Sequence, residues 1–406
     1  MKVVVVGGGA SGLASAIIAS RNGADVTILE RNSECGKKLL ITGNGRCNYW
    51  NLDQDLSHYH SENLECLKEF LTEEKKKSVD EFFTSLGIVP TIKNGYYYPY
   101  SNQATSIKRA LLKEIELQNI KIINNFYVEE IKKENVFFSI NPKKENLIFD
   151  KVILSTGSKA CPKTGSDGNG YTLVESFHHS IISVLPSLVQ LRGNKNYLKD
   201  WDGIRTNASL SLFLDGSLEK EEMGEIQLTN YGISGICTFN ISGIVAKALA
   251  RGKKTMIKIN FCPFIPKKDF LTWFSKRNET LHLETIEDLL EGFLNYKLIR
   301  VILKQANLKR NQKWNELSPN EEKCLSEWIT EFPLEIIGTN GFEKAQVCSG
   351  GVSLEEVNVN TMESVKEKGL YIIGELLDVD GDCGGYNLGF AWISAIIAGN
   401  GVVRND

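Results

Sequence analysis

Three glycines near the N-terminus have the spacing of a turn that binds phosphate groups. Gly7, Gly9 and Gly12 form a GxGxxG sequence directly after the apolar run 3–6. Glycine at these places allows a tight turn, close approach of the backbone to a pyrophosphate, and close packing of a helix on a strand. The helix expected to start near Ser11 would direct unpaired N–H groups and its positive dipole end to the same point. The sequence therefore predicts a binding site for a dinucleotide.

A carboxylate follows where such a fold needs one. Glu30 ends the second expected strand, 25–29, at about the distance from the glycines that the dinucleotide fingerprint requires. A carboxylate there accepts hydrogen bonds from a ribose diol and repels a 2′-phosphate. The glycines alone are a weak signal, because structural turns use them too. Together with the strand, the helix and Glu30, they predict a Rossmann-type domain.

The next segment favours FAD over NAD. A simple NAD domain would continue with a helix, whereas residues 35–48 are too rich in glycine to form one. Such a segment can wrap an extended ligand, with Lys37, Lys38 and Arg46 facing phosphate groups. A solvated loop is the alternative for the two lysines. The sequence has no second GxGxxG, which argues against a separate Rossmann site for NAD(P)H.

Two later segments are expected to approach the same ligand. Residues 149–157 have the pattern of a buried strand that ends in Thr156 and Gly157. Residues 369–375 have the pattern of another strand, and a glycine-rich stretch and an apolar helix over 389–398 follow. Glycines before a helix start suit the electron-rich edge of a reduced flavin ring. Both ends of the chain would then hold one cofactor.

These motifs, as they stand in the sequence, are GGGASGL, GKKLLITGNGRCN, SGGVSLEEVNVNTMES from Ser349, and GLYIIGELLDVDGDCGGYNLGFAW. The chain resembles, over nearly its whole length, bacterial FAD-binding oxidoreductases labelled NAD(FAD)-utilising dehydrogenases. That family includes aminoacetone oxidases and a flavin-dependent 3-oxo-steroid desaturase. The resemblance implies a glutathione-reductase-like FAD domain.

The resemblance also implies positions for the cofactor contacts. They fall at Ser11, Glu30, Arg31, Arg46, Asn48, Thr156, Gly157, Gly374, Glu375, Asp378, Asn387 and Leu388. Val128, on an expected strand, would contact the adenine side through its backbone. The predicted cofactor-binding set is completed by Gly7, Gly9, Ala10, Gly12, Lys38, Gly45, Cys47, Gly385 and Tyr386. The sequence indicates no catalytic acid or base, because an oxidised flavin accepts a hydride at N5 with little help from the protein.

The middle of the chain changes pattern. Short alternating strands such as 209–214 and 254–261 indicate a β-rich insert, interrupted by a helix over 234–249. Amphipathic helices are expected afterwards. We predict an α/β fold with a discontinuous Rossmann-type FAD-binding domain, an inserted β-rich subdomain and a helical subdomain. Their ranges are 1–186 with 345–406, 187–266 with 333–344, and 267–332.

Other candidate groups have plain structural alternatives. Asp378, Asp380 and Asp382 alternate as in a calcium loop, but the loop lacks the later glutamate, so we predict no metal. Covalent flavin attachment or a redox relay is open for Cys47 and Cys383, against the simpler role of small buried thiols.

Aromatic and histidine clusters leave similar choices. The tyrosines of the stretch 96–100 would either form a packed hairpin or line an aromatic substrate site. His178 and His179 are expected at the end of a helix, where a cation stabilises the helix dipole.

Composition narrows the class of protein. The 406 residues carry a formal net charge of −3, which provides no general basic field for nucleic acid or anionic lipid. Nine cysteines without a CxxC pair indicate reduced thiols and a cytoplasmic location. The three glycines interrupt the only N-terminal apolar stretch that could be a secretory signal, and no apolar run reaches the about 20 residues of a membrane span. We expect no membrane partner.

The favoured hypothesis is an FAD-dependent oxidoreductase that transfers a hydride between the flavin and a small organic substrate, either an amine or an enone or ketone. NAD(P)H or O2 would be its electron partner. A flavoprotein of tRNA modification and a non-enzymatic flavin-binding protein are the alternatives. The sequence does not indicate the oligomeric state.

Overall fold

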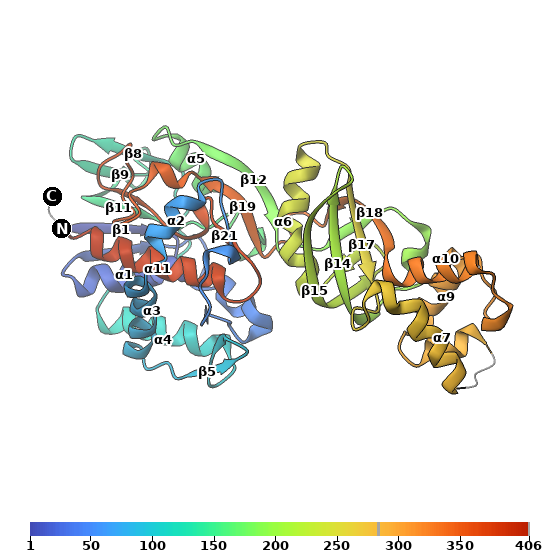
Figure 1. Cartoon of the computed structure of the whole chain (residues 1–406). Helices are drawn as coiled ribbons and strands as arrows, with labels where there is room; N and C mark the ends of the chain where they lie inside the picture. Colours follow the sequence, from blue (N-terminus) through green and yellow to red (C-terminus); the bar gives the residue numbers. More distant parts are fainter. Residues whose placement is uncertain (282–284, 405–406) are drawn as a thin grey trace. The chain divides into compact units, whose positions relative to one another are not determined.

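The computed structural model describes residues 1–281 and 285–404. The chain divides into two compact units, Met1–Pro186 with Ala345–Asp406, and Ser187–Lys344 (Figure 1). Residues 282–284 of the predicted helical subdomain and residues 405–406 of the predicted FAD-binding domain lie outside the described residues.

A five-stranded parallel sheet forms the centre of the first unit. Its order is β20-β11-β1-β2-β7. The strands are β1 (Lys2–Val6), β2 (Asp25–Leu29), β7 (Lys121–Ile123), β11 (Lys151–Leu154) and β20 (Leu370–Ile372). Val4 lies between Thr27 and Val152 in this register and is fully buried. Layers on both faces explain why these strands are nearly continuous apolar runs. The Rossmann-type α/β prediction is confirmed.

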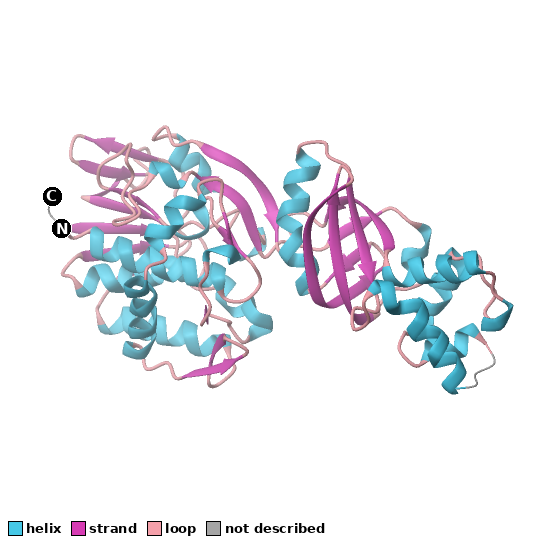
Figure 2. Cartoon of the chain, viewed as in Figure 1, coloured by secondary structure: helices cyan, strands magenta, loops and turns pink. Residues whose placement is uncertain are grey.

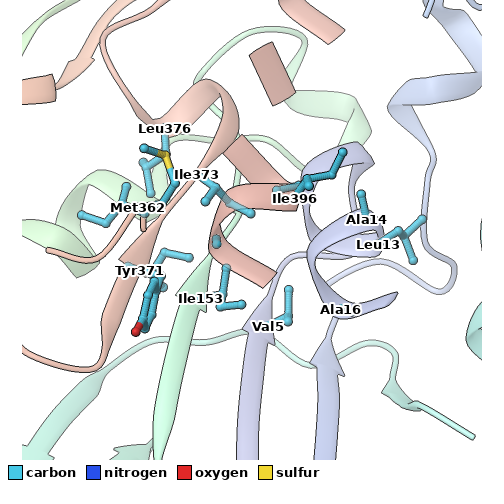
Figure 3. Close-up of a cluster of buried hydrophobic side chains, with 14 of the residues drawn as sticks. Val5, Leu13, Ala14, Ala16, Ile153, Met362, Tyr371, Ile373, Leu376 and Ile396 are labelled. Carbon is cyan, nitrogen blue, oxygen red and sulfur yellow. The ribbon is translucent and has the colours of Figure 1, made fainter. Parts of the chain in front are cut away.

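Two helices from opposite ends of the chain pack together on this sheet. Helix α1 (Ala10–Arg21) follows β1, and helix α11 (Tyr386–Gly401) lies beside it (Figure 1). Gly399 permits the close approach, because a Cβ there would lie 2.7 Å from Ile18 Cβ. Figure 3 shows Leu13 and Ala14 of α1 and Ile396 of α11 in one apolar cluster with Val5 and Ile153. Each buried valine, leucine or isoleucine of this cluster contributes about 1.5–3 kcal/mol.

Smaller elements complete this unit. Its other helices are α2 (Leu64–Phe70), α3 (Glu73–Ser85), α4 (Ala104–Leu117) and α5 (Asn169–Glu175). Its other strands are β3 (Trp50–Asn51), β4 (Tyr59–His60), β5 (Pro90–Lys93), β6 (Tyr96–Pro99), β8 (Ile131–Glu134), β9 (Phe137–Ile140), β10 (Leu147–Phe149), β12 (Ile181–Ser187), β19 (Val347–Val352) and β21 (Asp380–Gly381).

The expected strand around Val128 is wrong. Residues 124–130 lie in an irregular segment between β7 and β8. The side chain of Asn141 accepts hydrogen bonds from Glu129 N and Glu130 N, and Asn169 Nδ2 donates to Val128 O at 2.8 Å. These side chains bond the backbone groups that a neighbouring strand would otherwise bond.

The glycine-rich segment after β2 forms no α-helix, as its composition predicts. Lys38–Gly45 makes 3-10 turns that are interrupted at Thr42, Gly43 and Asn44. Gly43 and Asn44 have φ angles of 53° and 55°, in the left-handed region that glycine and asparagine tolerate.

The second unit contains a closed barrel and a group of helices (Figure 2). The barrel order is β13-β16-β15-β14-β17-β18. The strands are β13 (Leu191–Gly193), β14 (Arg205–Leu214), β15 (Ser217–Thr229), β16 (Gly232–Ser234), β17 (Thr255–Asn260) and β18 (Phe332–Thr339). The helices are α6 (Ile236–Ala250), α7 (Phe270–Leu281), α8 (Ile286–Glu291), α9 (Tyr296–Gln305) and α10 (Pro319–Thr330). Within residues 1–281 and 285–404, we find no helix with the length and apolarity that a membrane crossing demands.

Candidate functional site

The turn after β1 requires glycine at two of its positions. Gly7 has a φ of 103°, and a Cβ on it would lie 2.6 Å from Ser155 O. A Cβ on Gly12 would lie 1.9 Å from Gly7 O, so any side chain there would push α1 away from the turn. The geometry meets the packing requirement that the GxGxxG sequence predicts.

The middle of the same turn is open. A Cβ on Gly9 would meet no atom within 4 Å. Gly9 is the N-cap of α1, no side chain caps this helix, and its first turn, which includes Ala10 and Ser11, has no acidic residue. The first N–H groups of α1 and its positive dipole end therefore suit an anionic ligand at this point.

Glu30 is almost fully buried beside this turn. Its Oε2 accepts from Gly8 N at 2.8 Å, and its Oε1 accepts from Asn32 N and Asn32 Nδ2, both at 2.7 Å. These bonds fix the carboxylate, and because a carboxylate has about four acceptor sites, it retains capacity for a ribose hydroxyl.

Arg31, next in sequence, belongs to a neighbouring group of residues. It forms an ion pair with Asp167, donates to Gly165 O at 3.3 Å, and lies over the Tyr127 ring at 4.8 Å. The Val128 carbonyl, although outside any strand, is held by Asn169 close in sequence to Asp167. Arg31, a predicted cofactor contact, and Val128, predicted for the adenine side, thus share neighbours in the 165–169 segment.

The N-terminal and C-terminal motifs meet at two pairs of residues. A Cβ on Gly374 would lie 2.6 Å from Ser11 Oγ, so these residues are in close proximity. Lys38 Nζ donates to Glu375 Oε2 at 2.7 Å, and Ser158 Oγ donates to the same oxygen at 3.3 Å. The Lys38 ammonium thus pairs with a carboxylate of this unit.

Thr156 and Gly157 lie beside this junction. A Cβ on Gly157 would lie 4.0 Å from Glu375 Oε2 and 2.5 Å from Ser166 Oγ. A Cβ on Gly170 would lie 1.9 Å from Thr156 Oγ1, so helix α5 packs closely on this end of β11.

The start of α11 presents a second uncapped helix end. Its N-cap, Gly385, has a φ of 95°, and no side chain caps it. A Cβ on Gly385 would lie 3.0 Å from Asn48 Oδ1. This Asn48 oxygen is buried and has no hydrogen-bond partner in the part of the chain that the structure describes. A buried acceptor without a donor is costly, which indicates that a ligand donates to it.

Other predicted residues serve the protein itself in this structure. Asp378 is fully buried, and its Oδ2 accepts from Glu62 N at 2.8 Å. Asn387 bonds both backbone groups of Gly381, at 2.9 Å and 2.7 Å. Leu388 packs, partly buried, against the main core.

The Arg46 side chain is exposed, beside the exposed Gly45. It donates to Gly43 O at 3.3 Å and lies over the Tyr98 ring at 5.0 Å. Tyr98 lies on β6, which pairs with β5, so the guanidinium lies over this hairpin. The hairpin is one of the two structures predicted for the tyrosine stretch 96–100.

Cys47 is fully buried, and burial raises its pKa to about 11. The thiol is therefore protonated at neutral pH, which is the behaviour of a small packed side chain. Cys383 is partly buried.

The expected role of His179 at a helix end is wrong. Helix α5 ends at Glu175, and His179 is buried with Nδ1 2.9 Å from Glu356 Oε2 and Nε2 2.8 Å from Ser364 Oγ. Burial lowers the pKa of His179, although Glu356 opposes this effect. A neutral imidazole there cannot stabilise a helix dipole.

Sequence reasoning missed a polar cluster next to α11. His58 and His60 both contact Asp382, and the His58 ring stacks on Tyr386 with 4.5 Å between centroids. The alternating stretch SHYH was the available signal, but its partner lies more than 300 residues away. Over the described ranges, no group of three or more His, Cys, Asp or Glu residues has a metal-binding arrangement.

Comparison with known proteins identifies relatives over nearly the whole chain. A family model described as HI0933-like protein Rossmann domain matches residues 1–401. The chain is 40% identical to the 3-dehydro-bile acid delta(4,6)-reductase of Clostridium scindens, over 98% of both chains. It is 25% identical to the ribosomal RNA dihydrouridine synthase of Escherichia coli, over 97% of this chain and 95% of the relative.

A solved structure with a similar fold is the 3-ketosteroid-delta4-(5alpha)-dehydrogenase of Rhodococcus jostii RHA1, with a TM-score of 0.49 and 16% identity over 99% of this chain and 96% of that one. The family match covers nearly the whole chain, as the sequence motifs predict. The chain belongs to the HI0933-like Rossmann family, within the NAD(FAD)-utilising dehydrogenase superfamily, and is a flavin-type oxidoreductase.

Proposed function

We propose that this protein is an FAD-dependent reductase of a carbon–carbon double bond conjugated to a ketone, with a 3-oxo steroid acid as its substrate class. The observation that carries the proposal is the 40% identity, over 98% of both chains, to a 3-dehydro-bile acid delta(4,6)-reductase. The alignment thus spans both units of this chain and nearly the whole of the relative.

The residues of the site fit FAD. The open turn at Gly9 and the uncapped start of α1 would hold the pyrophosphate, and the fixed Glu30 carboxylate would accept from the adenosine ribose. The unpartnered Asn48 oxygen and the uncapped start of α11 would hold the polar edge of the ring system. FMN has no adenosine ribose, so it would offer the Glu30 carboxylate no ribose hydroxyl to accept from.

Bound flavin supplies hydride transfer at N5. The chain's own residues have the tasks of orienting the reacting groups and excluding water. Reduction of a conjugated double bond also requires one proton at the carbon next to the carbonyl.

A second candidate is reduction of uracil in ribosomal RNA. It is favoured by the 25% identity to an RNA dihydrouridine synthase over 97% of this chain. The chemistry is related, since the uracil 5,6-double bond is also conjugated to a carbonyl. The net charge of −3 gives this chain no general attraction for RNA, and for this reason we place the steroid first.

One experiment separates these possibilities. The purified protein should show a flavin spectrum and release FAD on denaturation. Under anaerobic conditions, NADH or NADPH should reduce the flavin and bleach it. A 3-oxo-4,6-diene bile acid should then reoxidise the flavin and restore its visible absorbance.

Control additions identify the other outcomes. Restoration by ribosomal RNA alone would support the second candidate. Bleaching by an amine would support an amine oxidase, with O2 as the electron acceptor. A folded protein that takes up no flavin would contradict the proposal.

A further inference from the structure

Four polar side chains lie side by side across adjacent segments of the barrel. Ser234 of β16 is directly opposite Gln227 of β15. On the other side of Ser234 lies Gln190, just before β13, because the register of β13 and β16 places it there. Gln190 O accepts in turn from Asn340 N at 3.0 Å. Residues directly opposite each other share one face of a sheet, so these four form a row, which we call the polar row.

The polar row lies on the face of the strands that is turned away from the barrel core. Leu191, Ile233 and Leu228 each adjoin a member of the row in sequence, and all three are fully buried in the core of the second unit. Successive side chains of a strand point to opposite faces. The polar row therefore faces outward.

Within residues 1–281 and 285–404, the side chains of the polar row form no hydrogen bond. Ser234 is only 8% exposed, although serine is usually an exposed residue. Gln190 Oε1 is buried. Polar groups that are buried without a partner are costly, so a ligand that bonds them would stabilise this face.

An exposed arginine lies on the same outer face. Arg192 follows Gln190 by two residues on β13, so both side chains point outward. Its opposite residues on the neighbouring strands are Gly338 of β18 and Gly232 of β16, and neither has a side chain to stand beside the guanidinium. No carboxylate in the part of the chain that the structure describes pairs with Arg192.

The surrounding charges favour a ligand with one carboxylate and several neutral oxygens. Arg205, opposite Gln227, forms an ion pair with Glu225 and so adds no net charge. Glu221 is exposed on the same face of β15, accepts from Ser211 Oγ, and would repel the phosphates of RNA. The polar row is uncharged and about 14 Å long, from three strand spacings, which is enough to follow a steroid nucleus.

We propose that this outer face of the second unit binds the steroid acid, with Arg192 at its carboxylate and the polar row at the ketone and hydroxyl oxygens of its rings. The inference rests on the proposed function, because that function supplies the substrate class. A guanidinium binds a carboxylate through two parallel hydrogen bonds, and amide and hydroxyl groups donate to neutral oxygens. The face should therefore distinguish a steroid acid from a neutral steroid.

Steroid binding to the oxidised, FAD-loaded enzyme tests this inference, because the steroid is not consumed without an electron donor. By calorimetry, the full-length wild type should bind a 3-oxo-4,6-diene bile acid about tenfold more tightly than its methyl ester. Arg192→Gln should bind the acid about tenfold more weakly than the wild type does, and the ester equally well. Arg300→Gln, at an exposed arginine of α9, is the matched control and should keep the preference for the acid.

Ser234→Ala tests the polar row separately. It should weaken the binding of acid and ester alike, by about three- to fivefold, since both carry the ring oxygens. Its melting temperature should equal that of the wild type, because the Ser234 hydroxyl has no partner among the described residues. Ser242→Ala is the control on the neighbouring helix α6. The Ser242 hydroxyl accepts from Val189 N at 3.1 Å, so this variant should lower the melting temperature and leave steroid affinity unchanged.

Two outcomes would overturn the inference: a retained preference for the acid in Arg192→Gln, or unchanged steroid affinity in Ser234→Ala. Weaker binding of ribosomal RNA by Arg192→Gln, with unchanged steroid affinity, would likewise overturn it and assign the face to RNA. A wild type that binds neither the acid nor the ester would instead contradict the proposed function.

Discussion

Gly9 and Gly12 lie in the same turn but have opposite surroundings. A methyl group on Gly12 would collide with the Gly7 carbonyl at 1.9 Å, whereas a methyl group on Gly9 would enter open space. Gly9 has an ordinary φ of −79°, which alanine adopts without strain. Gly12 is therefore required by the fold, whereas we expect Gly9 to be required by the ligand.

We expect Gly9→Ala to weaken FAD binding at least tenfold while the melting temperature of the apoprotein stays unchanged, since its methyl group would occupy the space expected for the pyrophosphate. Gly12→Ala should lower both the affinity for FAD and the melting temperature. Titration calorimetry and thermal unfolding would measure them, with Gly338→Ala as a control whose methyl group meets nothing within 4 Å. Full FAD affinity in Gly9→Ala would place the pyrophosphate elsewhere.

At the level of residues, the sequence is informative where a local pattern carries the chemistry. The glycine spacing and Glu30 lie within one strand–helix–strand unit, so their proximity follows from the chain itself. The cluster of His58, His60 and Asp382 joins segments more than 300 residues apart, and no local pattern predicts that contact.

Among the helices, the contact between α1 and α11 depends on a small residue. A Cβ on Gly399 would lie 2.7 Å from Ile18 Cβ and 2.9 Å from Ser15 O. Alanine favours a helix by about 0.5–1 kcal/mol relative to glycine, but overpacking a core costs about 1–3 kcal/mol. The collision should dominate, because Ser15 O belongs to the backbone of α1 and cannot rotate away.

We therefore expect Gly399→Ala to lower the free energy of unfolding by about 1–2 kcal/mol in urea titrations. Asn400→Ala, at the exposed neighbouring position, should change it by less than about 0.5 kcal/mol. If Gly399→Ala is as stable as the wild type, the two helices can separate without cost and the contact is not tightly packed.

Elements with a strong apolar pattern are predictable, and those held by distant side chains are not. The strand 25–29 and the apolar stretch of α11 follow from composition, although α11 begins three residues before the expected Gly389. The segment near Val128 is apolar enough to suggest a strand. It is not one because Asn141 and Asn169, both later in the sequence, bond its backbone.

For the whole molecule, the two units have separate cores. One core consists of residues from 1–186 and 345–406, and the other of residues from 187–344, including Trp201, Phe274 and Phe332. A unit with its own core and a continuous chain has what it needs to fold alone.

We expect a fragment of residues 187–344 to be monomeric and folded, to unfold cooperatively on heating, and to bind no flavin. Circular dichroism and calorimetry would measure this, with the full chain as the reference. An unfolded fragment would mean that the second unit depends on the first for its stability.

The division of the first unit between the two ends of the chain has a consequence for biosynthesis. Strand β20 and helix α11 come from the final part of the chain, yet β20 pairs with β11 and α11 covers α1. A ribosome releases the 187–344 segment before either of them. The barrel unit can thus fold during translation, while the edge of β11 and the apolar face of α1 stay uncovered until the last residues emerge. Exposed strand edges and apolar surface of this kind make a nascent chain prone to aggregation and are what chaperones protect.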